Sequence, residues 1–253
     1  MILLAVLAAL AAQVRDYVTG DQCLFCHRND IGPSWARNVH NLTTREQDGG
    51  FVLGLRRTRQ LRKDGYGRFA LWREGAWDKS TFADRCAGCH TTAVDPATRT
   101  FSAYGLDCYT CHGDVDLNHT KDTSLVWLSK KRRDDARAVM SICAQCHLRG
   151  GRSRTTGLPY PNSFVAGDDL FRDFEVDLSP EKLNTGDRHV WRNVRDVLQG
   201  GEVTCLSCHR VHIASSEKHR RVLTGPICLD CHYAEGPRRR VKPYEVHSAT
   251  CEY

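Results

Sequence analysis

The sequence predicts a mainly α-helical protein with extensive coil and a small β-hairpin, built around a core of packed prosthetic groups. Three observations support this fold class. A five-residue unit, Cys-x-x-Cys-His, occurs six times in 253 residues, and the apolar fraction of 41% is ordinary. After removal of a short apolar leader, about 40 residues remain for each copy. Regular secondary structure is therefore expected to be sparse.

The repeated unit is the attachment signature of c-type haem. In such a centre two thiols bond to the vinyl groups of haem, and the adjacent histidine ligates the iron as the proximal ligand. The six copies use twelve of the thirteen cysteines. We assign haem attachment to Cys23, Cys26, Cys86, Cys89, Cys108, Cys111, Cys143, Cys146, Cys205, Cys208, Cys228 and Cys231. The predicted proximal ligands are His27, His90, His112, His147, His209 and His232.

Structural zinc is the alternative for a pair of Cys-x-x-Cys units. The 18 residues between Cys89 and Cys108 fall in the zinc-ribbon range, as do the 19 between Cys208 and Cys228. However, a histidine follows every second cysteine, which has a chance probability on the order of 10⁻⁸ for a chain of this histidine content. Four-cysteine zinc sites have no use for that histidine, so haem is favoured. A redox dithiol is weaker still, because no βαβ context surrounds any copy.

The formal charge of +6 changes sign once haem is counted. Each haem carries two propionates, which brings the charge of the loaded protein to about −6. The basic runs Lys130–Arg133 and Arg238–Arg240 then serve as propionate partners or form a solvated face. Nucleic-acid binding is disfavoured.

The first twelve residues, Met1 to Ala12, are apolar and too short to span a bilayer. We interpret 1–12 as a signal peptide, although no Lys or Arg precedes the apolar run. Residues 13–253 then form one hexahaem cytochrome c domain in the periplasm or outside the cell. The Gly- and Pro-rich stretch from Gly150 to Asp169 marks a boundary between sub-parts 13–150 and 168–253.

Three regular elements are predicted between the motifs. The alternating and aromatic-rich stretch from Phe51 to Trp72 predicts a β-hairpin that turns at Asp64-Gly65. A partial apolar stripe predicts a helix over Ser124 to Ile142, leading into the fourth motif. A third element, a helix capped by Asp187 and stopped by Gly200-Gly201, carries His189 near its start.

Six histidines lie outside the motifs, one for each haem. They are His40, His119, His189, His212, His219 and His247. Because Met140 is the one methionine outside the leader, we predict that these histidines are the distal ligands. A distal ligand approaches iron from the face opposite the proximal one. His212 therefore cannot reach across the haem of His209, only three residues away, and serves a neighbouring haem. By the same reasoning, we expect His119 to ligate a haem other than that of His112.

These features resemble those of multihaem c-type cytochromes, in particular the group that includes the tetrahaem electron carrier of bacterial ammonia oxidation. The resemblance covers most of the chain from Cys23 to Cys251. Its specific elements are Trp35 to His40, Gly105 to Gly113 with His119 beyond, Ile142 to His147, and Val211-His212. In relatives the corresponding non-motif histidines often serve as distal ligands, which supports His40, His119 and His212 most.

The resemblance ends differently at the C-terminus. Relatives usually have a histidine followed by a further attachment motif, whereas here His247 precedes Cys251-Glu252-Tyr253. We interpret Cys251 as the first residue of a seventh motif that is lost by truncation or by an incomplete gene sequence. The alternative is a stray thiol or an intermolecular disulfide.

Two histidine ligands saturate the iron, which then transfers electrons but cannot bind substrate. The expected function is therefore electron transfer between redox partner proteins, with a membrane-associated donor as one source. The first alternative is a reductase or oxidase of a small nitrogen or sulfur compound with one open haem, although no motif shows the lysine that marks the catalytic haem of related nitrite reductases. The second is a filament subunit, in which a histidine of one copy ligates a haem of the next.

Electron paramagnetic resonance of the oxidised protein separates the electron carrier from the enzyme. If every iron has two histidine ligands, the spectrum is low-spin and the reduced protein binds no carbon monoxide. A stoichiometric high-spin signal together with carbon monoxide binding would favour the enzyme, and filaments of the purified protein would favour the subunit.

Overall fold

The computed structural model describes residues 20–47, 50–53, 60–63, 69–73, 76–78, 81–95, 100–161, 164–176 and 185–212. Several predicted features lie outside these residues: the signal peptide, the Asp64-Gly65 turn, the sixth motif with its ligand His232, and the distal candidates His219 and His247. Cys251 also lies outside them.

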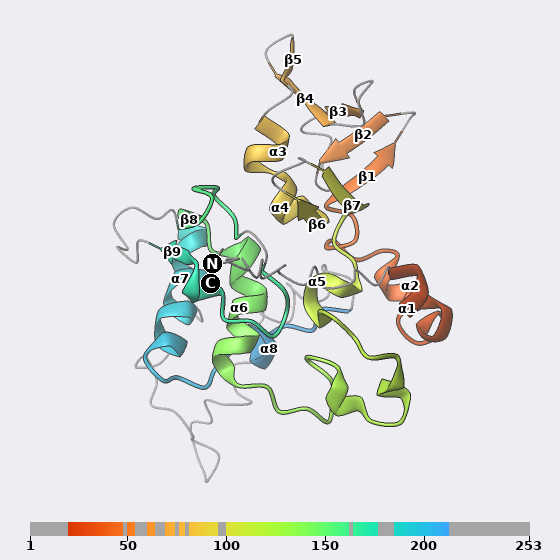
Figure 1. Ribbon diagram of the computed structural model, residues 1–253, viewed down its shortest axis with the longest axis vertical. Coiled ribbons are helices and arrows are strands. Elements are labelled where there is room, and N and C mark those ends of the chain that lie inside the picture. The colour runs from red at the N-terminus through yellow and green to blue at the C-terminus, as the bar shows by residue number, and fades with distance from the viewer. Residues whose placement is uncertain are drawn as a thin grey trace, which may run out of the picture.

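A five-stranded antiparallel sheet follows the first motif and lies at one end of the molecule (Figure 1). Its strands pair in chain order: β1 (Thr44–Gln47), β2 (Gly50–Leu53), β3 (Gln60–Lys63), β4 (Phe69–Arg73) and β5 (Ala76–Asp78). The predicted hairpin corresponds to β3 and β4, with Leu61 opposite Leu71. The sheet is larger than predicted, because the polar sequence of β1 and the three residues of β5 carry no strand pattern of their own.

A compact unit with a second hairpin joins the second and third motifs. Helices α3 (Thr81–Arg85) and α4 (Ala87–His90) lead into the antiparallel strands β6 (Thr91–Asp95) and β7 (Thr100–Tyr104), and α5 (Cys108–His112) follows. Phe82 and Ala87 are buried together, with Val94 and Phe101 packed against them. This small apolar cluster fixes α3 and α4 against the hairpin.

The first motif lies on α1 (Gly20–His27), which is followed by the short α2 (Gly32–Trp35). The backbone N–H of Gly20 donates to the carboxylate of Asp107 over 3.2 Å, and Asp107 also caps α5. One side chain therefore connects the start of α1 with the start of the third motif, 87 residues away.

The helix that carries the fourth motif, α6 (Ala136–His147), begins twelve residues later than predicted. Two short 3₁₀ turns, η1 (Leu117–Thr120) and η2 (Thr123–Leu125), and a loop precede it. Asp135 caps α6 by accepting from Ala138 N–H at 2.7 Å. The predicted helical stripe over the loop was wrong, because Leu128 adopts a left-handed conformation (φ 60°) and Asp134 binds its N–H.

A larger apolar core lies beneath α6. It contains Met140 and Ala144 of α6 and Leu148 directly after that helix. Residues of η3 (Leu170–Arg172), of β9 (Phe174–Val176), which pairs with β8 (Gly151–Ser153), and of α7 (Thr185–Leu198) complete it. Residues from both sides of the 150–169 stretch thus share one core. Figure 1 shows α6 and α7 side by side.

The predicted end of α7 is confirmed, whereas its predicted start is wrong. The helix begins at Thr185, so the prediction that Asp187 is its cap was wrong. Beyond its end, Gly200 has a φ of 95°, which glycine adopts without steric cost. The fifth motif follows on α8 (Cys205–Cys208).

Helix α6 contacts three other helices that carry attachment motifs, α4, α5 and α8. Among the described residues, no helix has the length and apolar character needed to cross a membrane.

The core beneath α6 predicts a difference between two leucines. Leu170 is 2% exposed and Leu125 is 39% exposed. Leu170→Ala should lower the free energy of unfolding by about 2–5 kcal/mol, because it leaves a cavity, whereas Leu125→Ala should change it by less than about 0.5 kcal/mol. Urea unfolding followed by circular dichroism measures both. Equal costs would contradict the assigned core.

Candidate functional site

Each described attachment motif lies on a short helical segment that ends at its histidine. α1, α4, α5 and α6 end at His27, His90, His112 and His147, and His209 follows α8 directly. Residues three apart on a helix lie on one face, one turn apart. The two cysteines of a motif therefore project to the same side, as attachment to one porphyrin edge requires. The side chain of Cys208 lies outside the description.

The first and third motifs meet through their first cysteines. A hydrogen bond from Cys108 lowers the pKa of the Cys23 thiol to about 7 and raises that of Cys108. The contact between Gly20 and Asp107 lies beside this pair. The two motifs are therefore neighbours, although 84 residues separate Cys23 from Cys108 in the sequence.

The second and fourth motifs meet through their second cysteines in a reciprocal arrangement. Cys89 Sγ lies 3.9 Å from the carbonyl oxygen of Gln145, and Cys146 Sγ lies 3.9 Å from that of Gly88. A hydrogen bond from Cys146 lowers the pKa of Cys89, and the pKa of Cys146 is raised in turn. These two motifs also lie side by side.

Polar contacts join the two pairs of motifs. Gln145 Nε2 donates to the carbonyl of Thr110, in the spacer of the third motif, over 3.3 Å. Buried Thr92, just after the second motif, accepts from Asp107 N–H at 3.0 Å and lies 3.3 Å from the Thr110 hydroxyl. The first four motifs thus form one connected group. The fifth joins it through Cys205 Sγ, 3.8 Å from Met140 Sδ in α6.

The non-motif histidines provide the most specific feature of the site. His119 lies beside His27, His40 beside His147, and His212 beside His112, with ring centroids 6.3, 6.0 and 5.9 Å apart. These three are all the non-motif histidines whose side chains the structure describes. Each of them meets a different motif histidine.

The separations fit a metal ion between the rings. With metal–nitrogen bonds of about 2 Å and about 1.2 Å from nitrogen to ring centre, opposed imidazoles have centroids about 6 Å apart. Ordinary aromatic contacts cover a range that includes this value. In every described case the pair joins one motif histidine with one non-motif histidine, which is the combination that a haem with two axial histidines would need. The residues therefore fit a haem with two axial histidines.

The Nδ1 atoms of five histidines point at oxygen atoms, which leaves Nε2 for a metal. The five contacts are His112 to Trp127 O at 2.6 Å, His119 to Asp116 O at 2.8 Å, His40 to Asn38 Oδ1 at 3.1 Å, His90 to Thr43 O at 3.3 Å, and His27 to Asp30 Oδ2 at 3.3 Å. Such contacts fix the tautomer and the orientation of a ligating imidazole.

Burial keeps one of the pairs neutral. It is the main cause that lowers the pKa of both His112 and His212. A histidine must be neutral to ligate a metal, so the environment of this pair favours ligation.

Asn38 places His212 and was not predicted from the sequence. Its side chain is buried and donates to the carbonyl of Val211 over 2.6 Å, across 173 residues. Buried Trp35 meets the ring of His212 edge-on, with centroids 6.3 Å apart. The stretch around the first motif thus holds the segment that follows the fifth. In the sequence, nothing about Asn38 indicates its contact with Val211.

For the predicted ligand His189 the structure describes the backbone alone. His189 lies in the second turn of α7, but its side chain is outside the description. Within the described part of the chain, no three His, Cys, Asp or Glu side chains gather as a metal-binding group. In comparisons with protein-family models, curated proteins and solved structures, no match to this chain was found.

The spacer of the second motif generates a test of local packing. A methyl group on Gly88 would overlap the ring of Tyr160, which is 2% exposed and whose hydroxyl donates to the carbonyl of Ala83. Gly88→Ala should therefore lower the free energy of unfolding by about 1–3 kcal/mol. Denaturant titration measures this.

The matched control for Gly88→Ala is the double variant with Tyr160→Ala, which removes both the ring and the Cγ atom that the new methyl group would overlap. Removal of the ring should make the extra methyl group tolerable, so the two costs should not add. Additive costs would show that Tyr160 does not cover the motif.

Proposed function

We propose that the chain is an electron-transfer protein that holds a c-type haem at each of its six motifs, with two axial histidines at most of them. The observation that carries this proposal is the set of three histidine pairs, each of which joins a motif histidine to a non-motif histidine. Neither zinc ribbons nor redox dithiols need such pairs.

The cysteines would hold the group covalently, and the two histidines of each pair would ligate its iron. When bound, haem supplies one-electron chemistry between its ferric and ferrous states. His27, His112 and His147 would be the proximal ligands of the three described pairs, and their partners would be the second histidine ligands, which would leave these irons no open position. Closed positions exclude small substrates, which favours a carrier over an enzyme.

The contacts between motifs support the same function. The first and third motifs touch through Cys23 and Cys108, and the second and fourth through Cys89 and Cys146. Attachment sites this close allow electrons to pass between successive centres within the chain. The electrons come from and go to redox partner proteins, and the protein works outside the cytoplasm, where c-type haem is attached in bacteria.

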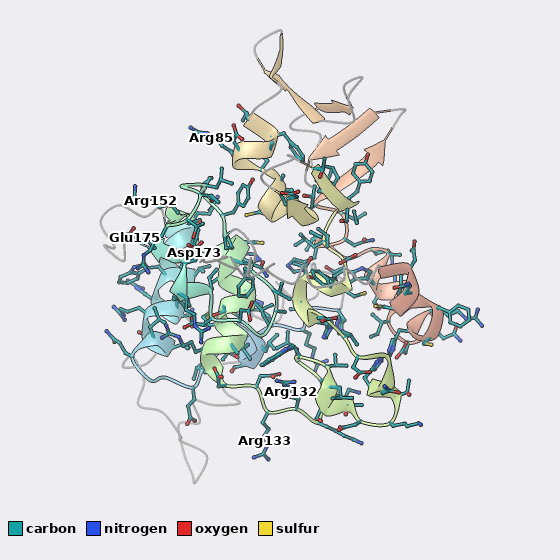
Figure 2. The ribbon with its side chains drawn as sticks, viewed as in Figure 1. Arg85, Arg132, Arg133, Arg152, Asp173 and Glu175 are labelled. Carbon is teal, nitrogen blue, oxygen red and sulfur yellow. The ribbon has the colours of Figure 1, made fainter. Side chains whose placement is uncertain are left out.

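The basic run Lys130–Arg133, which precedes α6, contains three exposed side chains and one that makes internal contacts. Figure 2 shows Arg133 extending away from the ribbon, and Lys130 and Lys131 are also exposed, so these side chains are free to meet propionates or an acidic partner. Arg132 differs, because Asp134 and the Ser124 carbonyl accept its hydrogen bonds. Its role is therefore internal.

Replacement of one distal candidate tests the proposal. The purified protein should carry six covalent haems, as a pyridine haemochrome assay measures, and His212→Ala should retain all six because the cysteines and proximal histidines are intact. One iron, that of His112, should become high-spin and bind carbon monoxide.

Added imidazole is the control for His212→Ala, since it should restore the low-spin spectrum by filling the opened position. A wild-type protein without covalent haem would refute the proposed function. Six haems with no high-spin iron in the variant would refute the pairing of His212 with His112.

A further inference from the structure

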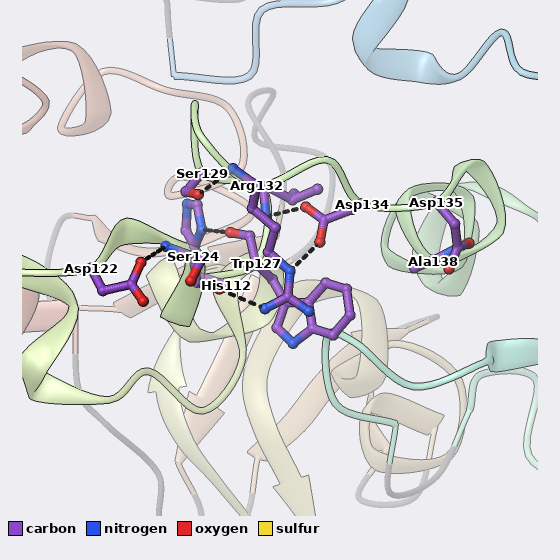
Figure 3. A network of polar contacts seen from close by, with 10 residues as sticks. His112, Asp122, Ser124, Trp127, Ser129, Arg132, Asp134, Asp135 and Ala138 are labelled. Carbon is purple, nitrogen blue, oxygen red and sulfur yellow. Dashed lines mark hydrogen bonds and ion pairs between the residues drawn. The ribbon is translucent and has the colours of Figure 1, made fainter.

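A single peptide group lies between His112 and a buried carboxylate. The carbonyl of Trp127 accepts from His112 Nδ1–H at 2.6 Å, and the N–H of the same peptide, that of Leu128, donates to Asp134 Oδ2 at 2.8 Å (Figure 3). Because a peptide group is planar and rigid, fixing its N–H also fixes its C=O. Asp134 therefore determines where the acceptor for His112 lies.

This arrangement is held by an unusual set of contacts. The side chain of Asp134 is 3% exposed, and its other oxygen accepts from Arg132 Nε at 2.6 Å. The guanidinium of Arg132 also donates to the carbonyl of Ser124 and lies 3.5 Å above the ring of Trp127. A buried carboxylate is costly unless it is paired, and here the pairing connects both ends of one loop.

The backbone is strained at the same point. Leu128 has a φ of 60°, in the left-handed region that side chains such as leucine rarely adopt. Gly167, from a distant loop, packs so closely on the Trp127 ring that a side chain at that position would overlap it. Strain of this kind persists where surrounding contacts over-determine it, and it gathers at functional positions.

The hydrogen bonds form a chain from the carboxylate to the imidazole. The negative charge of Asp134 polarises the peptide and increases the negative charge on the Trp127 oxygen, which strengthens the bond from His112. A stronger bond at Nδ1 makes Nε2 a better donor to iron and stabilises the ferric state. A carboxylate that acts directly on a ligating histidine has the same effect, but here the peptide lies between the two groups.

We propose that Asp134 is a positioning residue that acts on His112 through the Trp127–Leu128 peptide and lowers the reduction potential of the haem at the third motif. This inference rests on the proposed function, because it requires a haem ligated by His112. It assigns a role to a residue outside every attachment motif.

The test replaces Asp134 by its neutral isostere, in the loaded protein. Asp134→Asn should retain six haems and shift the midpoint potential of one haem to a more positive value in a spectropotentiometric titration. Asp134→Glu keeps the charge and should return that midpoint toward the wild-type value. Should the asparagine variant fail to fold, Asp134→Ser removes the same charge and carries the same expectation.

The iron–histidine bond provides a readout that a general loss of stability would not move. In a His212→Ala background the ferrous haem at the third motif has one axial histidine, and its iron–histidine stretching band is visible by resonance Raman spectroscopy. Addition of Asp134→Asn should shift that band to lower frequency, because the hydrogen bond at Nδ1 weakens.

Asp122→Asn is the matched control. Asp122 is exposed, carries the same charge and accepts hydrogen bonds from Ser124, and it makes none with the Trp127–Leu128 peptide in Figure 3. It should change neither the midpoint nor the band. Six haems with an unchanged midpoint and band in Asp134→Asn would overturn the inference alone. Absence of covalent haem from the wild-type protein would overturn the proposed function and this inference together.

Discussion

Three pairs of imidazole rings, each joining segments far apart in the sequence, organise most of the described chain. The apolar core beneath α6 and α7 is confined to one side of the molecule, and the cluster beside α3 is small. Elsewhere the attachment motifs meet through thiols, hydroxyls and backbone carbonyls, which are weak contacts individually. The correct approach of the histidine pairs therefore depends on how the backbone around each ring is held.

The backbone holds the rings mostly through polar groups. Asp107, Asp116 and Asp135 each accept from an N–H in the first turn that follows them, and each of these turns carries or precedes a histidine of a pair. Carbonyl oxygens then receive the Nδ1 atoms of His112 and His119. The short capped elements α5 and η1 suit a protein of this kind, because they orient a ring without the length of a regular helix such as α6.

Local features such as the motifs and helix α7 could be predicted from the sequence, whereas contacts between residues far apart in the chain could not. Motif spacing and the equal number of histidines inside and outside the motifs predicted both sets of ligands, and their ligation of haem stays a prediction. The apolar stripe of α7 predicted that helix, which the structure confirms. The start of α6 was missed because Asp134 and Leu128 hold the preceding loop in a conformation that tertiary contacts select. The hydrogen bond from Asn38 to the carbonyl of Val211 could not be predicted either, because a single buried asparagine produces no periodic pattern in the sequence. The haem-packed core stays a prediction.

The order of the paired residues along the chain is itself informative. The pairs join 27 with 119, 40 with 147 and 112 with 212, so the second loop begins inside the first, the third begins inside both, and each ends beyond the one before it. No pair is nested within a second one. Cutting the chain anywhere between 112 and 119 would separate all three pairs at once. The three histidine pairs therefore overlap along the chain and do not fall into separate sequence segments. A fragment that ends near residue 150 lacks His212, so it cannot retain both members of every pair.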